Sequence, residues 1–432
     1  MLGVGPVGPT GRWAASGEAG SASVGGPAPA SEPIPFRRRA RLTERQAWAV
    51  LTWVDGLGPV GFGALLRRFG SGLAILDAAL RPGAEARLVA AGVVDERETF
   101  DRAVAGAIVH VAVEPLPVLN RVELPGIEIL TTDDPAYPGR LLSIEMPPHV
   151  LFVRGSIKAL SAQHAVAVVG TRRPTEEGRA IGARIGGSLA KAGAVVVSGL
   201  AVGIDGASHA AAMSEGAPTV AVLGSGHARL YPRAHAKLAD RIVANGGAVV
   251  SEFVPDRPPS QYTFPRRNRL ISGLTDATVV VEAGIGSGAL ITADWALQQG
   301  RELFMLPGSI DAPQSAGCLE WLHRYPEQAR LVPSIPQLVH DLHLFETRRT
   351  GRRPSLAAEL VELGATARTV AIALVHGRAT VDELVAATGH SVATCLGALT
   401  MLETRGLATS AYGRYRPAGR LATAPKGSLA GR

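Results

Sequence analysis

Short apolar runs recur through the middle of the chain and predict the strands of a buried sheet. They are rich in valine and most end in glycine or serine: AVAVVG (165–170), AVVVSG (194–199), TVAVLG (219–224), AVVSEF (248–253), ATVVVEAG (277–284) and ELFMLPG (302–308). Segments with helical spacing separate several of them. Buried β-branched strands that alternate with helices predict an α/β fold with a doubly wound parallel sheet, covered on both faces. Ligands on such sheets bind at the carboxyl ends of the strands, where these glycines gather.

The patterns on either side of this region predict further domains. Residues 1–40 are rich in Gly, Ala, Pro and Ser, and we expect a disordered tail there. Over 41–115 the pattern is helical, and DGLGPVGFGALLRRFGS (55–71) resembles a helix-hairpin-helix, with a plain helical bundle as the alternative. We expect the α/β domain over 116–340 and a basic linker over 341–358.

Residues 359–418 have the pattern of a winged helix. Thr380 and Glu383 have capping-box spacing, Gly389 and Gly406 each follow a helix, and LATSAYGRYRP (407–417) predicts a two-stranded wing. The candidate recognition helix, Ser391 to Glu403, contains no Lys or Arg, unlike a helix that reads the major groove. A protein contact or structural packing is therefore favoured for it, and residues 419–432 are expected to form a flexible tail.

The positive charge lies at the two ends of the chain. The 432 residues have a formal net charge of +7, of which residues 1–41 contribute +3 and residues 348–432 contribute +7, so residues 42–347 sum to −3. An anion site in the α/β region must therefore be a local cluster. The two cysteines are far apart, which predicts neither a disulfide nor a zinc site. Without a long apolar run or a signal-peptide pattern, we expect a cytoplasmic protein with no membrane segment.

Two common nucleotide-binding motifs are missing from the sequence. No Gly-Lys pair occurs anywhere, which argues against a P-loop ATPase, and no G-x-G-x-x-G follows the first strand. We therefore expect no nucleotide cofactor and no metal. Three other glycine turns begin helices and predict phosphate contacts. The first, VVGTRRPTEEG (168–178), offers Gly170 and Arg172 beside a helix start at Pro174 or Thr175, unless Arg172 pairs with a nearby glutamate.

The other two turns repeat this arrangement. SGLAVGIDGASH (198–209) offers Ser198, Gly199 and Gly203, with Asp205 as a partner of the helix dipole. GIGSGALITA (284–293) offers Ser287 as an N-cap, followed by Gly288. Three such helix starts predict several phosphates. Glu282, before the last turn, is either the general base of a hydrolase or a structural partner for the arginines.

The stretch FPRRNRLISGL (264–274) carries three arginines at a helix start. Helical spacing places Arg267 on the buried arc with Leu270 and Ile271, whereas Arg266 and Arg269 lie to one side, facing solvent or a cleft rim. A buried guanidinium needs an anionic partner. We favour a ligand for Arg267, and an ion pair with Glu252 or Glu282 is the alternative.

Over residues 129–332 the chain resembles the DNA-processing protein A family (DprA, also called Smf). The resemblance lies in VAVVGTRRP, SGLAVGIDGASH, VLGSGHARLYP, FPRRNRLISGL and VVVEAGIGSGALITADWALQQGRELFMLPG, in that order. It implies an extended Rossmann-like domain that binds single-stranded DNA without strong sequence preference, loading of RecA in natural transformation and recombination, homodimerisation and no catalysis. The implied DNA-binding residues are Gly170, Arg172, Ser198, Gly199, Gly203, Arg266, Arg267, Asn268, Arg269, Ser287 and Gly288.

Four positions depart from the pattern of that family. Val202 and Gly286 stand where the family commonly has arginine, Ala289 where it has serine, and Leu319 where it often has Asn or His. The FPRRNR stretch must then supply more of the positive charge. The alternative function is a ribose-phosphate hydrolase on a related Rossmann scaffold, with Glu282 as base. The segment EAGIGSGALITA lacks the PGG element and the acidic end that such hydrolases usually show.

Overall fold

A nine-stranded sheet forms the centre of the computed structural model, which describes residues 42–344, 356–411, 414–418 and 421. The strand order is β11 (Ala329–Leu331), β10 (Glu302–Met305), β9 (Ala277–Val280), β5 (Ala165–Val169), β6 (Val195–Ser198), β7 (Thr219–Val222), β8 (Ala248–Ser251), β4 (Val150–Gly155) and β3 (Glu128–Thr131). The strands from β11 to β8 are parallel, whereas β4 and β3 add to β8 in antiparallel pairing. All six predicted strands are confirmed. The antiparallel pair and β11 were missed.

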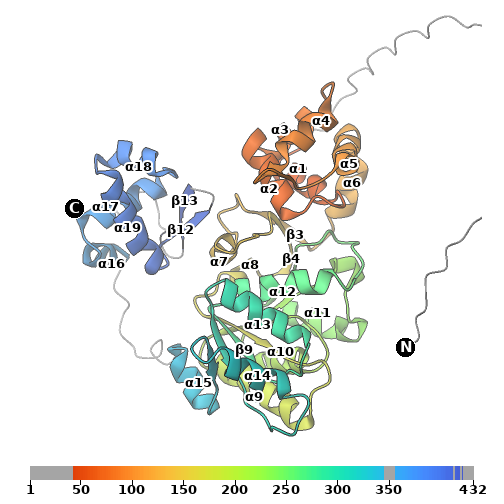
Figure 1. The fold of residues 1–432 in the computed structure, drawn as a ribbon, viewed down its shortest axis with the longest axis vertical. Helices are drawn as coiled ribbons and strands as arrows, with labels where there is room; N and C mark the ends of the chain where they lie inside the picture. The colour runs from red at the N-terminus through yellow and green to blue at the C-terminus, as the bar shows by residue number, and fades with distance from the viewer. Residues whose placement is uncertain (1–41, 345–355, 412–413, 419–420, 422–432) are drawn as a thin grey trace, which may run out of the picture. The chain divides into compact units, whose positions relative to one another are not determined.

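Helices cover both faces of this sheet, as the alternation of side chains along each strand requires (Figure 1). Ala165, Ala167 and Val169 of β5 face one core, built with α12 (Thr263–Gly273), α13 (Gly288–Gln298) and α14 (Ala316–Arg324). Val166 and Val168 face the opposite core, built with α9 (Glu176–Lys191), α10 (Ile204–Ser214) and α15 (Ile335–Asp341). A further cluster joins α10 and α11 (Ala236–Ala244) to β7 and β8. The doubly wound fold is therefore confirmed.

The order of the parallel strands reverses between β5 and β9. From β5 the chain proceeds through β6 and β7 to β8 on one side, and from β9 through β10 to β11 on the other. The loops that leave the carboxyl ends of β5 and β9 consequently diverge, and the crevice between them is the usual ligand site of such sheets.

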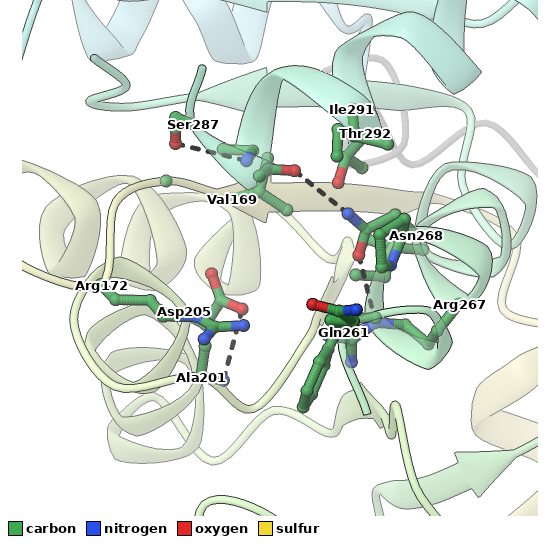
Figure 2. A pocket seen from close by; sticks show the side chains of 16 residues that line it. Val169, Arg172, Ala201, Asp205, Gln261, Arg267, Asn268, Ser287, Ile291 and Thr292 are labelled. Carbon is green, nitrogen blue, oxygen red and sulfur yellow. Dashed lines mark hydrogen bonds between the residues drawn. The ribbon is translucent and has the colours of Figure 1, made fainter. Parts of the chain in front are cut away.

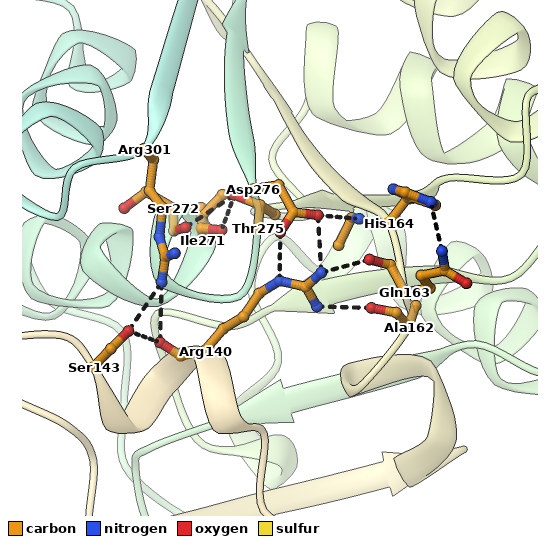
Figure 3. A network of polar contacts seen from close by, with 11 residues as sticks. Arg140, Ser143, Ala162, Gln163, His164, Ile271, Ser272, Thr275, Asp276 and Arg301 are labelled. Carbon is orange, nitrogen blue, oxygen red and sulfur yellow. Dashed lines mark hydrogen bonds and ion pairs between the residues drawn. The ribbon is translucent and has the colours of Figure 1, made fainter. Parts of the chain in front are cut away.

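A network of polar contacts holds the amino ends of β5 and β9 together (Figure 3). Asp276, just before β9, accepts a hydrogen bond from the Ala165 N–H of β5 at 3.0 Å and pairs with both Nε and Nη2 of Arg140 at 2.8 Å. Arg140 also donates to the carbonyl oxygens of Ala162 and Gln163 before β5. Its own carbonyl accepts from Arg301. These contacts fix the register of the two strands that flank the crevice.

The chain before the sheet is helical. It comprises α1 (Glu44–Thr52), α2 (Pro59–Phe69), α3 (Gly72–Ala79), α4 (Ala84–Ala91), α5 (Arg102–Val113) and α6 (Pro115–Val122), with a small hairpin of β1 (Val93–Val94) and β2 (Arg97–Glu98). Gly56, at φ 86°, makes the predicted turn between α1 and α2. The Gly56 N–H donates to Asp55 Oδ1, and the Gly58 N–H donates to the Gly56 carbonyl. The turn itself therefore supplies the acceptors for both N–H groups.

The C-terminal region has the helices and wing of the predicted winged helix. It contains α16 (Leu356–Glu362), α17 (Ala365–Val375), α18 (Val381–Thr388), α19 (Val392–Thr404), β12 (Ala408–Ala411) and β13 (Arg414–Pro417). The capping box of Thr380 with Glu383 and the left-handed Gly389 are confirmed. The expected tails, and most of the expected basic linker, lie outside the described residues.

Two short helices and two 3-10 turns complete the connections between strands: α7 (Gly139–Leu142), α8 (Ile157–Leu160), η1 (His227–Arg229) and η2 (Arg233–His235), with the chain continuing into α11. In the described ranges no single helix is both long and apolar enough to cross a membrane. Two pairs of helices reach that length and apolarity when each pair is taken together. They are α5 with α6, across a bend of 92°, and α18 with α19, across a bend of 109°.

Candidate nucleic-acid interface

A cavity of about 440 Å³ opens at the carboxyl end of β5, on the side of the sheet switch point (Figure 2). Its walls come from the β5–α9 loop, the β6–α10 loop, the first turns of α12 and the start of α13. The lining residues are Val169, Gly170, Arg172, Ala201, Asp205, Gln261, Phe264, Pro265, Arg267, Asn268, Ile271, Ser287, Gly288, Ala289, Ile291 and Thr292. The volume is typical of a site that encloses one small molecule or one unit of a polymer.

Arg267 forms the floor of this cavity, as its place on the buried arc predicted. It is 4% exposed, and its Nη1 donates to the carbonyl oxygens of Gly199, at 2.9 Å, and Val222. Burial lowers the pKa of its guanidinium to about 10, although the nearby Asp205 carboxylate opposes that shift. Arg267 therefore stays charged at neutral pH. Neither predicted ion-pair partner, Glu252 or Glu282, holds it.

The structure corrects the prediction made for Arg269, on the side of α12. This residue was expected to face solvent or a cleft rim, but its side chain is 1% exposed and forms a bidentate pair with Glu252, at 2.6 and 2.8 Å. Its Nε also donates to the carbonyl of Met146, in the loop before β4. Helical spacing could not reveal this because a second layer of chain covers the flank of α12. Arg266, 44% exposed at its side chain, faces solvent as predicted.

Asn268 links Arg267 to the start of α13. Its Oδ1 accepts from Arg267 Nε at 3.2 Å, and its Nδ2 donates to the Gly288 carbonyl at 3.1 Å. Ser287 is the N-cap of α13, as predicted, and accepts from the Ala289 N–H. A helix begins with four N–H donors that lack an intrahelical partner, and the first of them, at Gly288, belongs to a residue that lines the cavity. The α13 dipole therefore favours an anion here.

At the other two helix starts, carboxylates of the protein already bind the N-cap or the loop before the helix. Both oxygens of Glu282 accept from Thr175, the N-cap of α9, at 2.9 and 2.8 Å. Asp205 Oδ2 accepts from the Gly199 and Ala201 N–H groups before α10. Burial raises the pKa of Asp205, opposed by Arg267. Glu282 is thus a structural partner, but its partner is Thr175 and not an arginine. Of the three helix starts predicted to bind phosphate, only the start of α13 still offers a free N–H group to the cavity.

Arg172 supplies the exposed positive charge of the cavity. No ion pair of its guanidinium occurs among the described residues, so the predicted alternative of a glutamate partner is not observed. The guanidinium instead lies over the Phe264 ring, 5.1 Å from its centre, and Tyr231 packs on the same ring at 5.7 Å. Figure 2 shows Arg172 beside Asp205 on one side, and Asn268 and Thr292 on another. An arginine held on an aromatic ring is pre-organised for phosphate.

The structure divides the residues of the sequence prediction into two groups. Gly170, Arg172, Arg267, Asn268, Ser287 and Gly288 line the cavity, whereas Ser198, Gly199, Gly203, Arg266 and Arg269 do not. Ser198 is buried and donates to the Val168 carbonyl. A Cβ at Gly199 would meet the Arg267 guanidinium at 2.8 Å, and one at Gly203 would meet the Thr171 carbonyl at 2.5 Å. These two glycines allow the protein's own loops to approach each other.

Sequence reasoning missed several lining residues. Phe264, Gln261 and Thr292 were not proposed, although Phe264 begins the quoted arginine stretch, and an aromatic beside arginines is itself a signal for single-stranded nucleic acid. Thr292 lies just over one turn after Ser287 on α13 and could be found only after the helix was placed.

The two positions where the family commonly has arginine are both open to solvent. Val202 is 38% exposed. Gly286 lies at φ 73°, and a Cβ there would meet no atom within 4 Å. Space alone would therefore admit a longer side chain at either position.

Comparisons with known proteins agree with this fold. Residues 128–343 match the family described as DNA recombination-mediator protein A, and residues 354–414 match the DprA winged helix domain. Protein Smf of Synechocystis is 31% identical over 87% of this chain and 99% of its own length. Protein Smf of Escherichia coli is 46% identical, but the alignment spans 51% of this chain and 58% of that protein.

One solved structure supports the same fold, and a second is similar over half of the chain. The X-ray structure of DprA from Streptococcus pneumoniae is 29% identical, covers 70% of this chain and 98% of its own, and has a TM-score of 0.58. A DprA structure from Helicobacter pylori, described for its single-stranded DNA binding mode, is 30% identical over 50% of this chain and 96% of its own, with a TM-score of 0.46. No group of three or more potential metal-binding side chains occurs among the described residues.

Proposed function

Since this chain belongs to the DprA/Smf family of DNA-processing and recombination-mediator proteins, we propose that it binds single-stranded DNA in the cavity at the β5–β9 switch point and loads RecA onto that DNA. The observation that carries the proposal is the pairing of an exposed Arg172 with the start of α13 at Gly288 across one cavity. Both favour an anion, and Arg267 adds a buried charge beneath them.

The surroundings of the cavity favour a single strand over a duplex. A cavity of about 440 Å³ admits one nucleotide unit but not the width of a double helix. Phe264 lines it and Tyr231 packs beside it, while Tyr262 is 76% exposed at the start of α12. Aromatic faces beside a basic groove stack bases of any sequence, which fits binding without strong sequence preference.

More arginine lies beside the cavity than within it. Arg173, Arg229 and Arg233 are exposed, and none of them forms an ion pair within the described ranges. The turn that carries Arg233 lies against the β6–α10 loop, because His235 Nδ1 bonds to the Leu200 carbonyl at 2.9 Å. Val202 belongs to that loop. These arginines therefore compensate in part for the missing charge at Val202 and lengthen the path available to a strand.

RecA loading and homodimerisation rest on membership of the family. They belong to this proposal because a recombination mediator must deliver its DNA to a partner. RecA loading is tested by the rate at which RecA filaments assemble on single-stranded DNA with and without this protein. An unchanged rate would remove RecA loading from the proposal and leave DNA binding intact.

A salt titration tests the DNA-binding site itself. Binding to a labelled, unstructured oligonucleotide should weaken with salt, and Arg172→Ala should lower both the affinity and the steepness of the salt dependence, by about 0.7 in the log–log slope. Arg184→Ala is the matched control, because Arg184 is exposed on α9 and does not line the cavity. Equal losses in both variants, or no binding by the wild type, would refute the site.

A further inference from the structure

The loop between β6 and α10, residues 199–203, forms part of the cavity wall. Its Gly199 and Ala201 N–H groups donate to Asp205 Oδ2, at 3.0 and 3.4 Å. The Gly199 carbonyl accepts from Arg267 Nη1 at 2.9 Å. Ala201, Asp205 and Arg267 all line the cavity. The path of this loop therefore sets both the position of one wall and an acceptor for the buried guanidinium beneath the cavity.

The loop turns through a backbone conformation that surrounding contacts must support. Leu200 has φ 58°, in the left-handed region that residues with a Cβ rarely adopt, and it is fully buried. Such a residue keeps its conformation only where its neighbours hold it in place. Because Leu200 is inaccessible to solvent, water cannot serve its carbonyl oxygen, which needs a partner from the protein.

That partner is His235, the last residue of η2. Its Nδ1 lies 2.9 Å from the Leu200 carbonyl oxygen and donates to it, since a carbonyl can only accept. The imidazole also packs against the first turn of α10, where a Cβ at Gly206 would meet His235 Cε1 at 2.6 Å. The Gly206 N–H in turn donates to the Ala201 carbonyl at 3.1 Å. His235 thus supports the loop and the helix turn that follows it, although it does not line the cavity.

We propose that His235 is a positioning residue for the binding of single-stranded DNA: its hydrogen bond to Leu200 holds the β6–α10 loop in the shape that the cavity requires. This inference rests on the proposed function of the cavity. Without the donor, the Leu200 carbonyl would be buried and unpaired, and the loop would relax out of its left-handed turn to satisfy it. Ala201 would then leave the wall, and the Gly199 carbonyl would no longer face Arg267.

Two substitutions of His235 separate its hydrogen-bond donor from its bulk. His235→Ala removes the donor, whereas His235→Asn keeps one, because the Asn amide nitrogen stands the same number of bonds from the backbone as His Nδ1. His227→Ala is the matched control. His227, on the neighbouring turn η1, donates through Nε2 to the Phe152 carbonyl, also at 2.9 Å, and does not line the cavity. Both histidines are partly buried, so the two alanine variants lose a similar hydrogen bond in different places.

Fluorescence anisotropy with a short labelled oligothymidylate measures the effect in the full chain. We expect His235→Ala to weaken binding about tenfold, the loss typical of one hydrogen bond. His235→Asn should restore most of the affinity, and His227→Ala should bind as the wild type does. The salt slope should stay unchanged in all three variants, because none of them removes a phosphate contact. A stoichiometric titration counts the active protein in each sample, so a loss of stability alone does not register as weaker binding.

The possible outcomes separate this inference from the proposed function. If His235→Ala binds like the wild type while Arg172→Ala is impaired, the positioning role is overturned and the DNA site remains. Failure of His235→Asn to restore binding would overturn the positioning role as well, because the donor would not be what matters. A shallower salt slope in His235→Ala would overturn it in favour of a direct contact between the imidazole and a phosphate. No binding by the wild type would refute the proposed function and the inference together.

Discussion

The cavity at the sheet edge and the outer face of α19 are the two places where a protein of this kind would be expected to meet DNA, and they differ in how charge is arranged. At the cavity, arginines and a helix start converge although residues 42–347 are net negative. On α19 the outer face, which includes the exposed Ala393, Leu396 and Gly397, has no charge although residues 348–432 carry +7. Net charge of a region therefore predicts neither site, and the position of individual side chains decides both.

The largest expected effect tests the buried charge that supports the cavity. Arg269→Met removes the bidentate partner of Glu252 and leaves that buried carboxylate with one exposed arginine, so the free energy of unfolding should fall by about 3–5 kcal/mol. Denaturant unfolding measures it. Arg266→Met, which affects the exposed partner of the same carboxylate, should cost less than about 1 kcal/mol. Similar costs for both would show that Arg269 is no more structural than its exposed neighbour.

The same pair predicts a dependence of stability on pH. Burial alone would raise the pKa of Glu252, but Arg269 and Arg266 outweigh it and hold that pKa below its ordinary value of 4.5. A carboxyl with a lowered folded pKa contributes stability above its unfolded pKa and loses it as pH falls through the folded one. The wild type should therefore lose more stability below about pH 4.5 than the Glu252→Gln variant does. Parallel pH profiles would contradict this.

The next effect tests the helix start that faces the cavity. Gly288→Pro removes one N–H donor at the first position of α13, where proline is tolerated, and the preceding Ser287 already has the extended backbone that proline requires. Losing one hydrogen bond to a phosphate should weaken single-stranded DNA binding about tenfold to a hundredfold. Gly288→Ala keeps the N–H and serves as control. Equal affinities of the two variants would exclude a phosphate at this donor.

A smaller gain is expected from restoring charge at Val202. Val202→Arg should strengthen DNA binding several-fold at low salt and steepen the log–log salt dependence by about 0.7. Gly286→Arg adds the same charge at a residue with φ 73°, where a side chain costs about 1–2 kcal/mol, so its stability should fall. If Val202→Arg leaves affinity and salt slope unchanged, the strand does not pass the β6–α10 loop.

The smallest expected effect concerns the outer face of α19. Leu396→Glu on the α19 face should leave the affinity for a short single-stranded oligonucleotide unchanged, because that face contributes no contact to one strand in the cavity. Fluorescence anisotropy at low protein concentration measures it, with the wild type alongside. A clear loss of affinity would mean that α19 faces DNA, and the contrast between the two regions would disappear.

Local signals in the sequence were sufficient to predict most helices and strands and their order along the chain. Valine-rich runs predicted β5 to β10, and Ser287 and Thr380 were identifiable as N-caps. The spacing around Leu270 predicted that Arg267 is buried. Each signal depends on neighbours within a few residues, which is why it could be read from the sequence. The family followed from motif order over the same region.

Only the tertiary structure decided which partner each polar group has. Arg269 and Arg267 are two residues apart and both buried, yet Arg269 pairs with Glu252, just after β8, whereas Arg267 donates to carbonyls at the ends of β6 and β7. Glu282 binds the N-cap of α9 and Asp205 binds the loop before α10, at two helix starts that looked equivalent to the third. Most of these partners come from segments far along the chain. The free energy of a buried charge depends on what surrounds it in space, and periodicity along one helix cannot supply that information.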